Sequence, residues 1–264
     1  MFLPPPFEKD TENSMAARAK ILWRAAYEGS LPELLAQLDA GADPDAFEDA
    51  GTPPLSIAAA RGHKECLRAL LEAGADPNTP CDNGDLPIAW ALSAGEFERA
   101  AELFEAGARL GAVQREANNP IISCFRTGSG LSSGPWLAAR GADPAVCGRS
   151  GETIAMLAAA GEPKALGWCA KMGVDLDAKD FFGCSAAHYA ALNDAKESLR
   201  ILESLGADIR SVDKEGQTPE ALARSYGFDE FATLCQSLLA ERERLLIGEA
   251  LPSESSANKP ARRV

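Results

Sequence analysis

The segment Gly41-Ala42-Asp43-Pro44 is the first of six related segments that are spaced almost evenly along this chain of 264 residues. The other copies, intact or altered, are Gly74-Ala75-Asp76-Pro77, Gly107-Ala108-Arg109-Leu110, Gly141-Ala142-Asp143-Pro144, Gly173-Val174-Asp175-Leu176 and Gly206-Ala207-Asp208-Ile209. Successive glycines lie 33, 33, 34, 32 and 33 residues apart. A constant period of this length indicates one structural unit stacked many times.

A second marker keeps the same phase, because a polar residue, usually with a proline, precedes each alanine-rich segment. The copies are Thr52-Pro53-Pro54-Leu55, Asp85-Leu86-Pro87-Ile88, Asn119-Pro120-Ile121, Thr153-Ile154, Ser185-Ala186-Ala187-His188 and Thr218-Pro219-Glu220. A polar N-cap followed by proline favours the start of a helix, since the first helical N–H has no intrahelical partner.

A second helix is predicted between each alanine-rich helix and the next Gly-Ala-Asp segment. Residues 64–73 are an example, with apolar side chains at 66, 67, 70 and 71 that form one stripe at helical spacing. Glycines such as Gly62 and Gly227 follow the first helices, where a left-handed C-cap is expected. Each unit is therefore a helix, a tight turn, a second helix and an extended loop.

This pattern resembles the ankyrin repeat, which carries Thr-Pro-Leu-His, an alanine pair and Leu-Leu-x-x-Gly-Ala-Asp in about 33 residues. The copy from Gly51 to Asn78 fits it best, and the likeness extends over about residues 16–240. It implies an all-α ankyrin-repeat solenoid of stacked helix-turn-helix units with extended, hairpin-like loops. We expect flexible tails at 1–15 and 248–264 and a single repeat domain at 16–247, with units near 16–48, 49–81, 82–114, 115–147, 148–179, 180–212 and 213–247.

The unit from Asn119 to Arg140 departs from the pattern, because glycine and serine crowd residues 127–134. The run lacks the Gly-Lys-Ser/Thr ending and the preceding strand of a phosphate-binding loop. We therefore expect an irregular loop here, with a local change of curvature or a soft joint in the stack.

Composition narrows the classes of function. A net charge of −13 argues against general nucleic-acid binding and against anionic membrane surfaces. Seven widely spaced cysteines without a Cys-x-x-Cys pair fit reduced thiols. Neither a signal peptide nor a membrane-spanning run stands out. We predict an acidic cytoplasmic protein, monomeric when free, with no nucleic-acid or membrane partner.

Few residues suggest catalysis. The two histidines, His63 and His188, occupy a turn and the Thr-Pro-Leu-His position, for which the resemblance implies structural roles. The cysteines lack the spacing of a zinc site, and no base accompanies any of them. The acidic residues Asp82 and Asp85 are typical of a solvated loop. We predict no catalytic residue, no metal and no cofactor.

The resemblance implies a concave binding face formed by the loop tips and the first helix of each unit. The positions predicted to bind a partner are Asp49, Arg61, Asp82, Asn83, Asp85, Arg115, Glu116, Asn118, Arg126, Arg149, Glu152, Lys179, Phe181, Phe182, Asn193, Lys214, Gln217 and Tyr226. Adjacent phenylalanines at a loop tip leave apolar area exposed and favour binding, unless one ring folds back onto the neighbouring loop. Phe47 is a weaker case, and Trp90 is predicted to lie in the core.

The leading hypothesis is a protein–protein interaction module that acts as an adaptor or as an inhibitor, for instance an immunity-type protein. The resemblance also leaves open a bacterial host-directed effector or a scaffold. A hypothesis from another class is an enzyme or ligand-binding protein whose pocket lies in the irregular middle unit.

Overall fold

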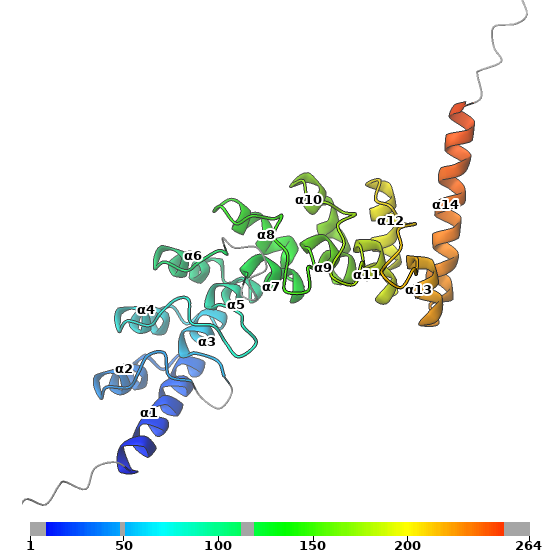
Figure 1. Cartoon of the computed structure of the whole chain (residues 1–264). Helices are drawn as coiled ribbons and strands as arrows, with labels where there is room; N and C mark the ends of the chain where they lie inside the picture. Colours follow the sequence, from blue (N-terminus) through cyan, green and yellow to red (C-terminus); the bar gives the residue numbers. More distant parts are fainter. Residues whose placement is uncertain (1–8, 48–50, 112–118, 251–264) are drawn as a thin grey trace, which may run out of the picture.

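Paired helices in two layers form the whole described structure (Figure 1). The computed structural model describes residues 9–47, 51–111 and 119–250. The first helices of the pairs are α1 (Lys9–Glu28), α3 (Pro54–Ala60), α5 (Pro87–Ser93), α7 (Pro120–Arg126), α9 (Ile154–Gly161), α11 (Ala186–Leu192) and α13 (Pro219–Ser225). The second helices are α2 (Leu31–Asp39), α4 (Lys64–Glu72), α6 (Phe97–Glu105), α8 (Gly130–Ala138), α10 (Leu166–Lys171), α12 (Lys196–Ser204) and α14 (Asp229–Ala250). A short 3-10 turn, η1 (Pro163–Ala165), precedes α10, and these ranges contain no strand, so the all-α prediction is confirmed.

Polar N-caps start several first helices as predicted. The side chain of Asn119 accepts a hydrogen bond from the backbone N–H of Ile121 at 3.1 Å. The hydroxyl of Thr218 accepts from the N–H of Ala221 at 3.2 Å. Each cap satisfies a donor that the helix itself leaves unpaired, and such caps contribute about 1 kcal/mol.

Two helices differ from that prediction. Pro53 is the N-cap of α3 and Leu86 is the N-cap of α5, and neither makes a side-chain cap bond. The polar residues Thr52 and Asp85 lie one position earlier than predicted. In both segments a proline follows the cap directly and already presets the helical φ angle, so the helix starts without a polar cap.

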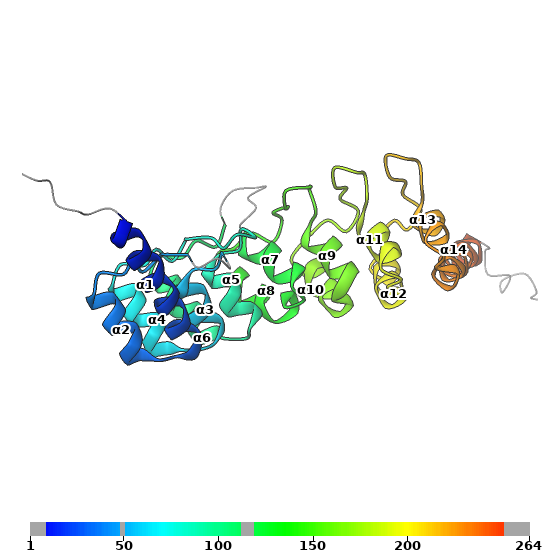
Figure 2. The same ribbon diagram turned by 90° about the horizontal axis from the view of Figure 1, so that it is seen from below.

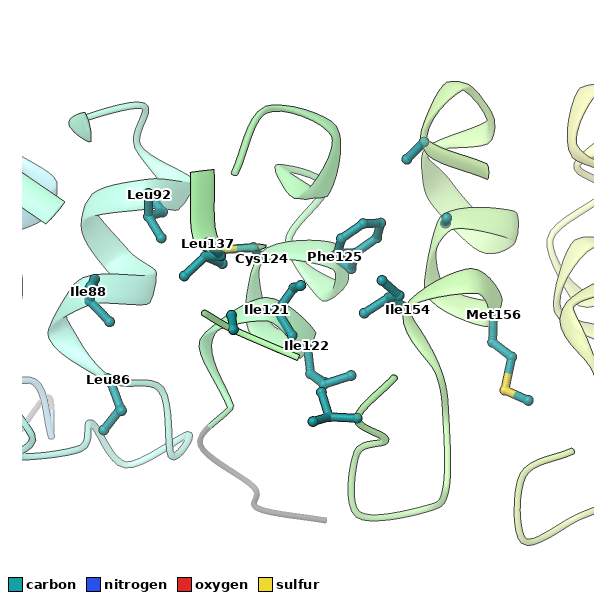
Figure 3. Close-up of a cluster of buried hydrophobic side chains, with 14 of the residues drawn as sticks. Leu86, Ile88, Leu92, Ile121, Ile122, Cys124, Phe125, Leu137, Ile154 and Met156 are labelled. Atoms are coloured by element: carbon teal, nitrogen blue, oxygen red, sulfur yellow. The ribbon is translucent and has the colours of Figure 1, made fainter. Parts of the chain in front are cut away.

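The core is a continuous row of apolar side chains between neighbouring repeats. Figure 3 shows its middle section, where Leu92, Ile121, Leu137 and Ile154 come from α5, α7, α8 and α9. All four are fully buried, and each contributes roughly 2 kcal/mol of hydrophobic free energy. No repeat could bury these side chains alone, so the stack is the unit of stability.

Alanine pairs allow the first helices to approach one another closely. Ala58-Ala59, Ala158-Ala159 and Ala190-Ala191 are all fully buried at equivalent places in their repeats. Alanine combines the highest helix propensity with the smallest side chain that still fixes the backbone. This arrangement explains the alanine-rich composition.

The middle repeat is more regular than predicted. Gly130–Ala138 forms helix α8, although an irregular loop was expected over residues 127–134. A Cβ atom on Gly130 would lie 2.5 Å from the ring of Phe125, and one on Gly134 would lie 2.9 Å from the ring of Trp168. The two rings stack with centroids 5.9 Å apart. These glycines therefore make room for an aromatic pair, which spacing along the sequence does not reveal.

The terminal helices extend beyond the predicted domain limits. Helix α1 begins at Lys9, inside the segment 1–15 that was expected to be a flexible tail. Residues 9–15 carry no apolar period, so periodicity alone does not predict a helix there. At the other end α14 continues to Ala250, past the predicted limit of 247. No helix in the described ranges is both long and apolar enough to cross a membrane.

The stack is curved, and the first helices line the inner side of the curve (Figure 1). The row of repeats runs obliquely from α1 to α8 and levels out between α9 and α14, so its direction changes at the irregular repeat. The loops that connect successive repeats project beyond the first helices on one common edge (Figure 2).

Candidate functional site

The described loop tips share one backbone geometry. They are residues 81–85, 148–152, 180–184 and 213–217. In each tip the first N–H donates to the carbonyl of the last residue, as from Asp180 to Cys184 at 3.0 Å, and the fourth residue donates to the first, as from Gly183 to Asp180 at 3.0 Å. Gly183 has a φ of +81°, a conformation that favours glycine.

Backbone hydrogen bonds also join neighbouring loops. The N–H of Phe181 donates to the carbonyl of Ser150 at 2.8 Å, and the N–H of Lys214 donates to the carbonyl of Phe182 at 2.9 Å. Nearer the N-terminus, the N–H of Asp82 donates to the carbonyl of Gly51 at 2.8 Å. The tips 148–152, 180–184 and 213–217 are therefore joined in one row, and the tip 81–85 is joined to the preceding loop at Gly51.

An aspartate organises each of the last two tips. Oδ1 of Asp180 accepts backbone N–H bonds from Phe182 and Cys184 at 2.9 and 2.8 Å. Oδ1 of Asp213 accepts the two equivalent bonds, both at 2.9 Å. These carboxylates accept hydrogen bonds from N–H groups of the turn that have no backbone acceptor.

The tip at 148–152 has Gly148 where the later tips have aspartate, and Glu152 supplies the missing carboxylate. Oε2 of Glu152 accepts from the N–H of Ser150 at 2.9 Å, and Oε1 pairs with Arg126 at 2.8 Å. A Cβ atom on Gly148 would lie 2.2 Å from Oε1. Glu152, predicted to bind a partner, is only 7% exposed. The side chain of Glu152 therefore stabilises the loop, and an ion pair with Glu152 holds the guanidinium of Arg126.

The two phenylalanines of the next tip have different surroundings. A Cβ atom on Gly151 would lie 3.1 Å from the ring of Phe181, so this ring lies over the preceding loop and is 46% exposed. Phe182 is 67% exposed, the largest exposed fraction among the phenylalanines of the described residues. The alternative in which one ring folds back therefore describes Phe181, and Phe182 carries the apolar area at the tip.

Both histidines lie between repeats. Nδ1 of His188 accepts the backbone N–H of Ser185 at 3.1 Å, and its Nε2 is 3.0 Å from the carbonyl oxygen of Gln217 in the next loop. An imidazole that accepts at Nδ1 and donates at Nε2 is neutral. His63 places Nε2 3.1 Å from the carbonyl oxygen of Tyr27 in the preceding repeat. Their side chains thus link adjacent repeats.

Acidification is expected to lower stability through His188, because burial lowers the pKa of its imidazole below the ordinary value of 6.5. As the pH falls the unfolded chain binds the proton first. The contribution of His188 is therefore complete above about pH 6.5 and is lost as the pH falls through the lower folded-state pKa. Urea unfolding of the wild type and of His188→Gln, at about pH 7.5 and about pH 5.5, measures this. The wild type should lose more stability than the variant, and equal losses would show that His188 has no part in it.

The remaining predicted residues divide by exposure. Arg61, Asp82, Asn83, Arg126, Arg149, Lys179, Asn193, Lys214 and Tyr226 are exposed, and Asp85 and Gln217 are half-buried. Asp49, Arg115, Glu116 and Asn118 lie outside the described residues. Several of the exposed side chains are held in place: Nζ of Lys179 donates to the carbonyl of Val212 at 2.6 Å, and the ring of Tyr226 stacks on Phe228. Phe47 is also exposed.

Trp90 is half-buried rather than fully in the core, and it lines a hollow on the inner side of the stack. The hollow has a volume of about 340 Å³ and also contacts Ser93, Thr127 and Asp85. Sequence reasoning did not include Trp90, Ser93 or Thr127 in the binding face. The sequence does contain a signal for two of them, because residues 90 and 93 are three apart and so share one face of a first helix.

The buried thiols of Cys81, Cys124 and Cys169 are poorly suited to nucleophilic chemistry. Burial raises the pKa of Cys81 and of Cys124 to about 11, and that of Cys169 to about 12. A thiol with such a pKa is protonated near neutrality, whereas nucleophilic cysteines are thiolates. Within residues 9–47, 51–111 and 119–250, no three His, Cys, Asp or Glu side chains form a group that could hold a metal ion.

Comparison with known proteins agrees with this architecture. A family model described as ankyrin repeats in three copies matches residues 22–114. Ankyrin repeat domain-containing protein 37 of Bos taurus is 37% identical over 82 residues, which are 29% of this chain and 52% of that protein. Protein phosphatase 1 regulatory subunit 27 of Mus musculus is 36% identical over 81 residues, which are 31% of this chain and 53% of that protein. The matched segment thus spans about half the length of these two relatives.

The fold similarity extends further than the sequence similarity. The crystal structure of the human ASB11 ankyrin repeat domain superposes with a TM-score of 0.65 at 23% identity. The superposition covers 81% of this chain and 96% of that domain. Likeness at this level of identity shows the fold, and it includes the repeats beyond residue 114.

Proposed function

We propose that this chain, which is an ankyrin-repeat protein, binds a partner protein through its loop tips and the inner surface of its first helices. Phe182 is the observation that supports this most strongly. An apolar ring that is 67% exposed costs free energy in water, and here it stands on a tip whose backbone is tied to both neighbours. Exposed aromatic side chains on a rigid support are typical of interface hot spots.

Rigidity is the second supporting feature. Because the last three tips are already connected by backbone hydrogen bonds, little conformational entropy is lost when a partner binds them. The exposed cationic side chains Arg149 and Lys214 lie on the two neighbouring tips and supply a polar rim around the ring. An edge of this kind favours a folded protein surface over a small ligand.

For the biological role we propose an adaptor or an inhibitor that covers part of its partner. One relative is named as a regulatory subunit of a phosphatase, and a regulatory subunit acts on another protein. An immunity-type inhibitor that neutralises a toxin belongs to the same class of mechanism. Such a role needs no chemistry from this chain, which agrees with the protonated thiols and the neutral His188.

Affinity purification from the source cells with mass spectrometry tests the proposal. Phe182→Ala is expected to reduce recovery of the partner by about tenfold or more, as truncation of a hot-spot aromatic does. The matched control is Phe104→Ala, which removes an exposed phenylalanine from α6 on the outer layer. Equal recovery with both variants, each shown to be folded by circular dichroism, would contradict binding through the tip.

A further inference from the structure

The hollow beside Trp90 combines an apolar wall with a polar rim. Ala60 of α3 and Ala89 and Trp90 of α5 form the wall, while Asn83 and Asp85 come from the loop tip before α5. The volume of about 340 Å³ accommodates one long side chain. A ligand there would touch apolar atoms along its length and a carboxylate near one end.

Trp90 is oriented so that its polar edge is inside the protein. Its indole Nε1 is buried, and no hydrogen-bond partner for it occurs among the described residues. The indole therefore presents no polar atom to the hollow. Indole is the aromatic group that attracts cations most strongly, because of the negative face of its π system.

The charge around the hollow is negative. Asp85 accepts hydrogen bonds from Asn83 at 2.8 Å and from the hydroxyl of Ser123, both of which are uncharged. Asp82 is exposed on the same tip. No ion pair joins Asp82 or Asp85 to a lysine or arginine within the described part of the chain.

Two of the predicted cations on the inner face are engaged by other repeats. The guanidinium of Arg61 lies 3.8 Å from the ring centroid of Tyr27, and its Nε donates to the Tyr27 carbonyl. Arg126 pairs with Glu152 in the following loop. Neither of these two side chains pairs with Asp82 or Asp85, and among the described residues the two carboxylates have no cationic partner.

We propose that the hollow beside Trp90 receives a lysine or arginine side chain of the partner protein, with its stem against the indole and its charged head at Asp85. This inference rests on the proposed function and adds the chemistry of the partner. Long basic side chains are suited to such a site, because the stem is apolar and only the head is charged. The net charge of −13 would in addition speed the approach of a basic partner.

Peptide libraries provide a test that does not require the partner. Four mixtures of short peptides are immobilised and probed with the labelled full-length chain. All peptides in one mixture have the same central residue, which is arginine in the first mixture, lysine in the second, leucine in the third and glutamate in the fourth. The wild type should bind the arginine and lysine mixtures about tenfold more strongly than the other two. Trp90→Ala and the double variant Asp82→Asn/Asp85→Asn should each lose most of that preference.

Glu215→Gln is the matched control, because Glu215 is an exposed carboxylate on the last tip. It should retain the preference. If Glu215→Gln and the double variant reduce basic-peptide binding alike, net charge alone explains the binding and the proposal is wrong. Trp90→Phe, which keeps an aromatic ring, should retain part of the preference, whereas equal loss in the phenylalanine and alanine variants would count against an aromatic–cation contact.

The purification experiment separates this inference from the proposed function. If Phe182→Ala loses the partner while Trp90→Ala and the double variant retain it, protein binding through the tips stands and the basic-side-chain site is rejected. If neither Phe182→Ala nor the hollow variants lower recovery, the proposed function itself fails.

Discussion

Replacing Phe125 with alanine is expected to lower the free energy of unfolding by about 3 to 5 kcal/mol. The side chain is 2% exposed and stacks on Trp168. Its ring lies against Gly130 and Gly134, which have no side chains to move into the space left behind. The cavity would therefore persist, and persistent cavities give the largest losses.

The unfolding of this variant should also separate into two steps. Repeats interact only with their neighbours, so a loss at one junction uncouples the N-terminal repeats from the C-terminal ones. Urea titrations followed by circular dichroism and tryptophan fluorescence measure both effects. Phe104→Ala, at an exposed position, is the control and should cost about 1 kcal/mol or less. A single transition with a similarly small loss for Phe125→Ala would contradict this account of the middle repeat.

Glu152→Ala is expected to destabilise the protein by about 2 kcal/mol, although the residue lies at a loop tip. The substitution leaves the N–H of Ser150 without its acceptor and removes the partner of Arg126. An unpaired donor in a partly buried turn costs about 1 to 3 kcal/mol. Chemical denaturation of the variant measures the loss, and partner binding need not be known.

The effect of Gly148→Asp should change sign with the residue at position 152. In the wild type the new side chain would collide with Oε1 of Glu152 and destabilise the loop. In Glu152→Ala the space is empty, and the aspartate can accept the turn's N–H bonds as Asp180 and Asp213 do. A double-mutant cycle should therefore give a coupling of about 2 kcal/mol. Additive effects of the two substitutions would show that Glu152 does not replace the missing aspartate.

The sequence predicts the architecture well because the repeat period is a global constraint. Six segments in one phase determine where helices begin, which faces are apolar and on which side the loops lie. The same period places Phe182 at a tip and His188 between loops. A unit whose sequence departs from the repeat pattern does not change the predicted architecture, because its neighbours pack against it on both sides.

The details of the site could not be predicted because they depend on pairs of residues in space. In the sequence Glu152 resembles an exposed loop carboxylate. Only the structure shows that its side chain occupies the space beside Gly148. Phe181 and Phe182 are adjacent phenylalanines on one tip, yet of the two only Phe181 lies against Gly151. Trp90 was predicted to be buried, because helical position alone does not show whether its neighbours, such as Ala60, leave a hollow.

Hydrogen–deuterium exchange of the chain, free and bound to the partner recovered by purification, shows which face the partner covers. We expect slower exchange on binding in the tips 81–85, 148–152, 180–184 and 213–217 and along the inner side of the first helices. The outer helices α4, α6 and α12 should be unchanged. Protection confined to those outer helices, with unchanged exchange at the tips, would contradict binding through this face.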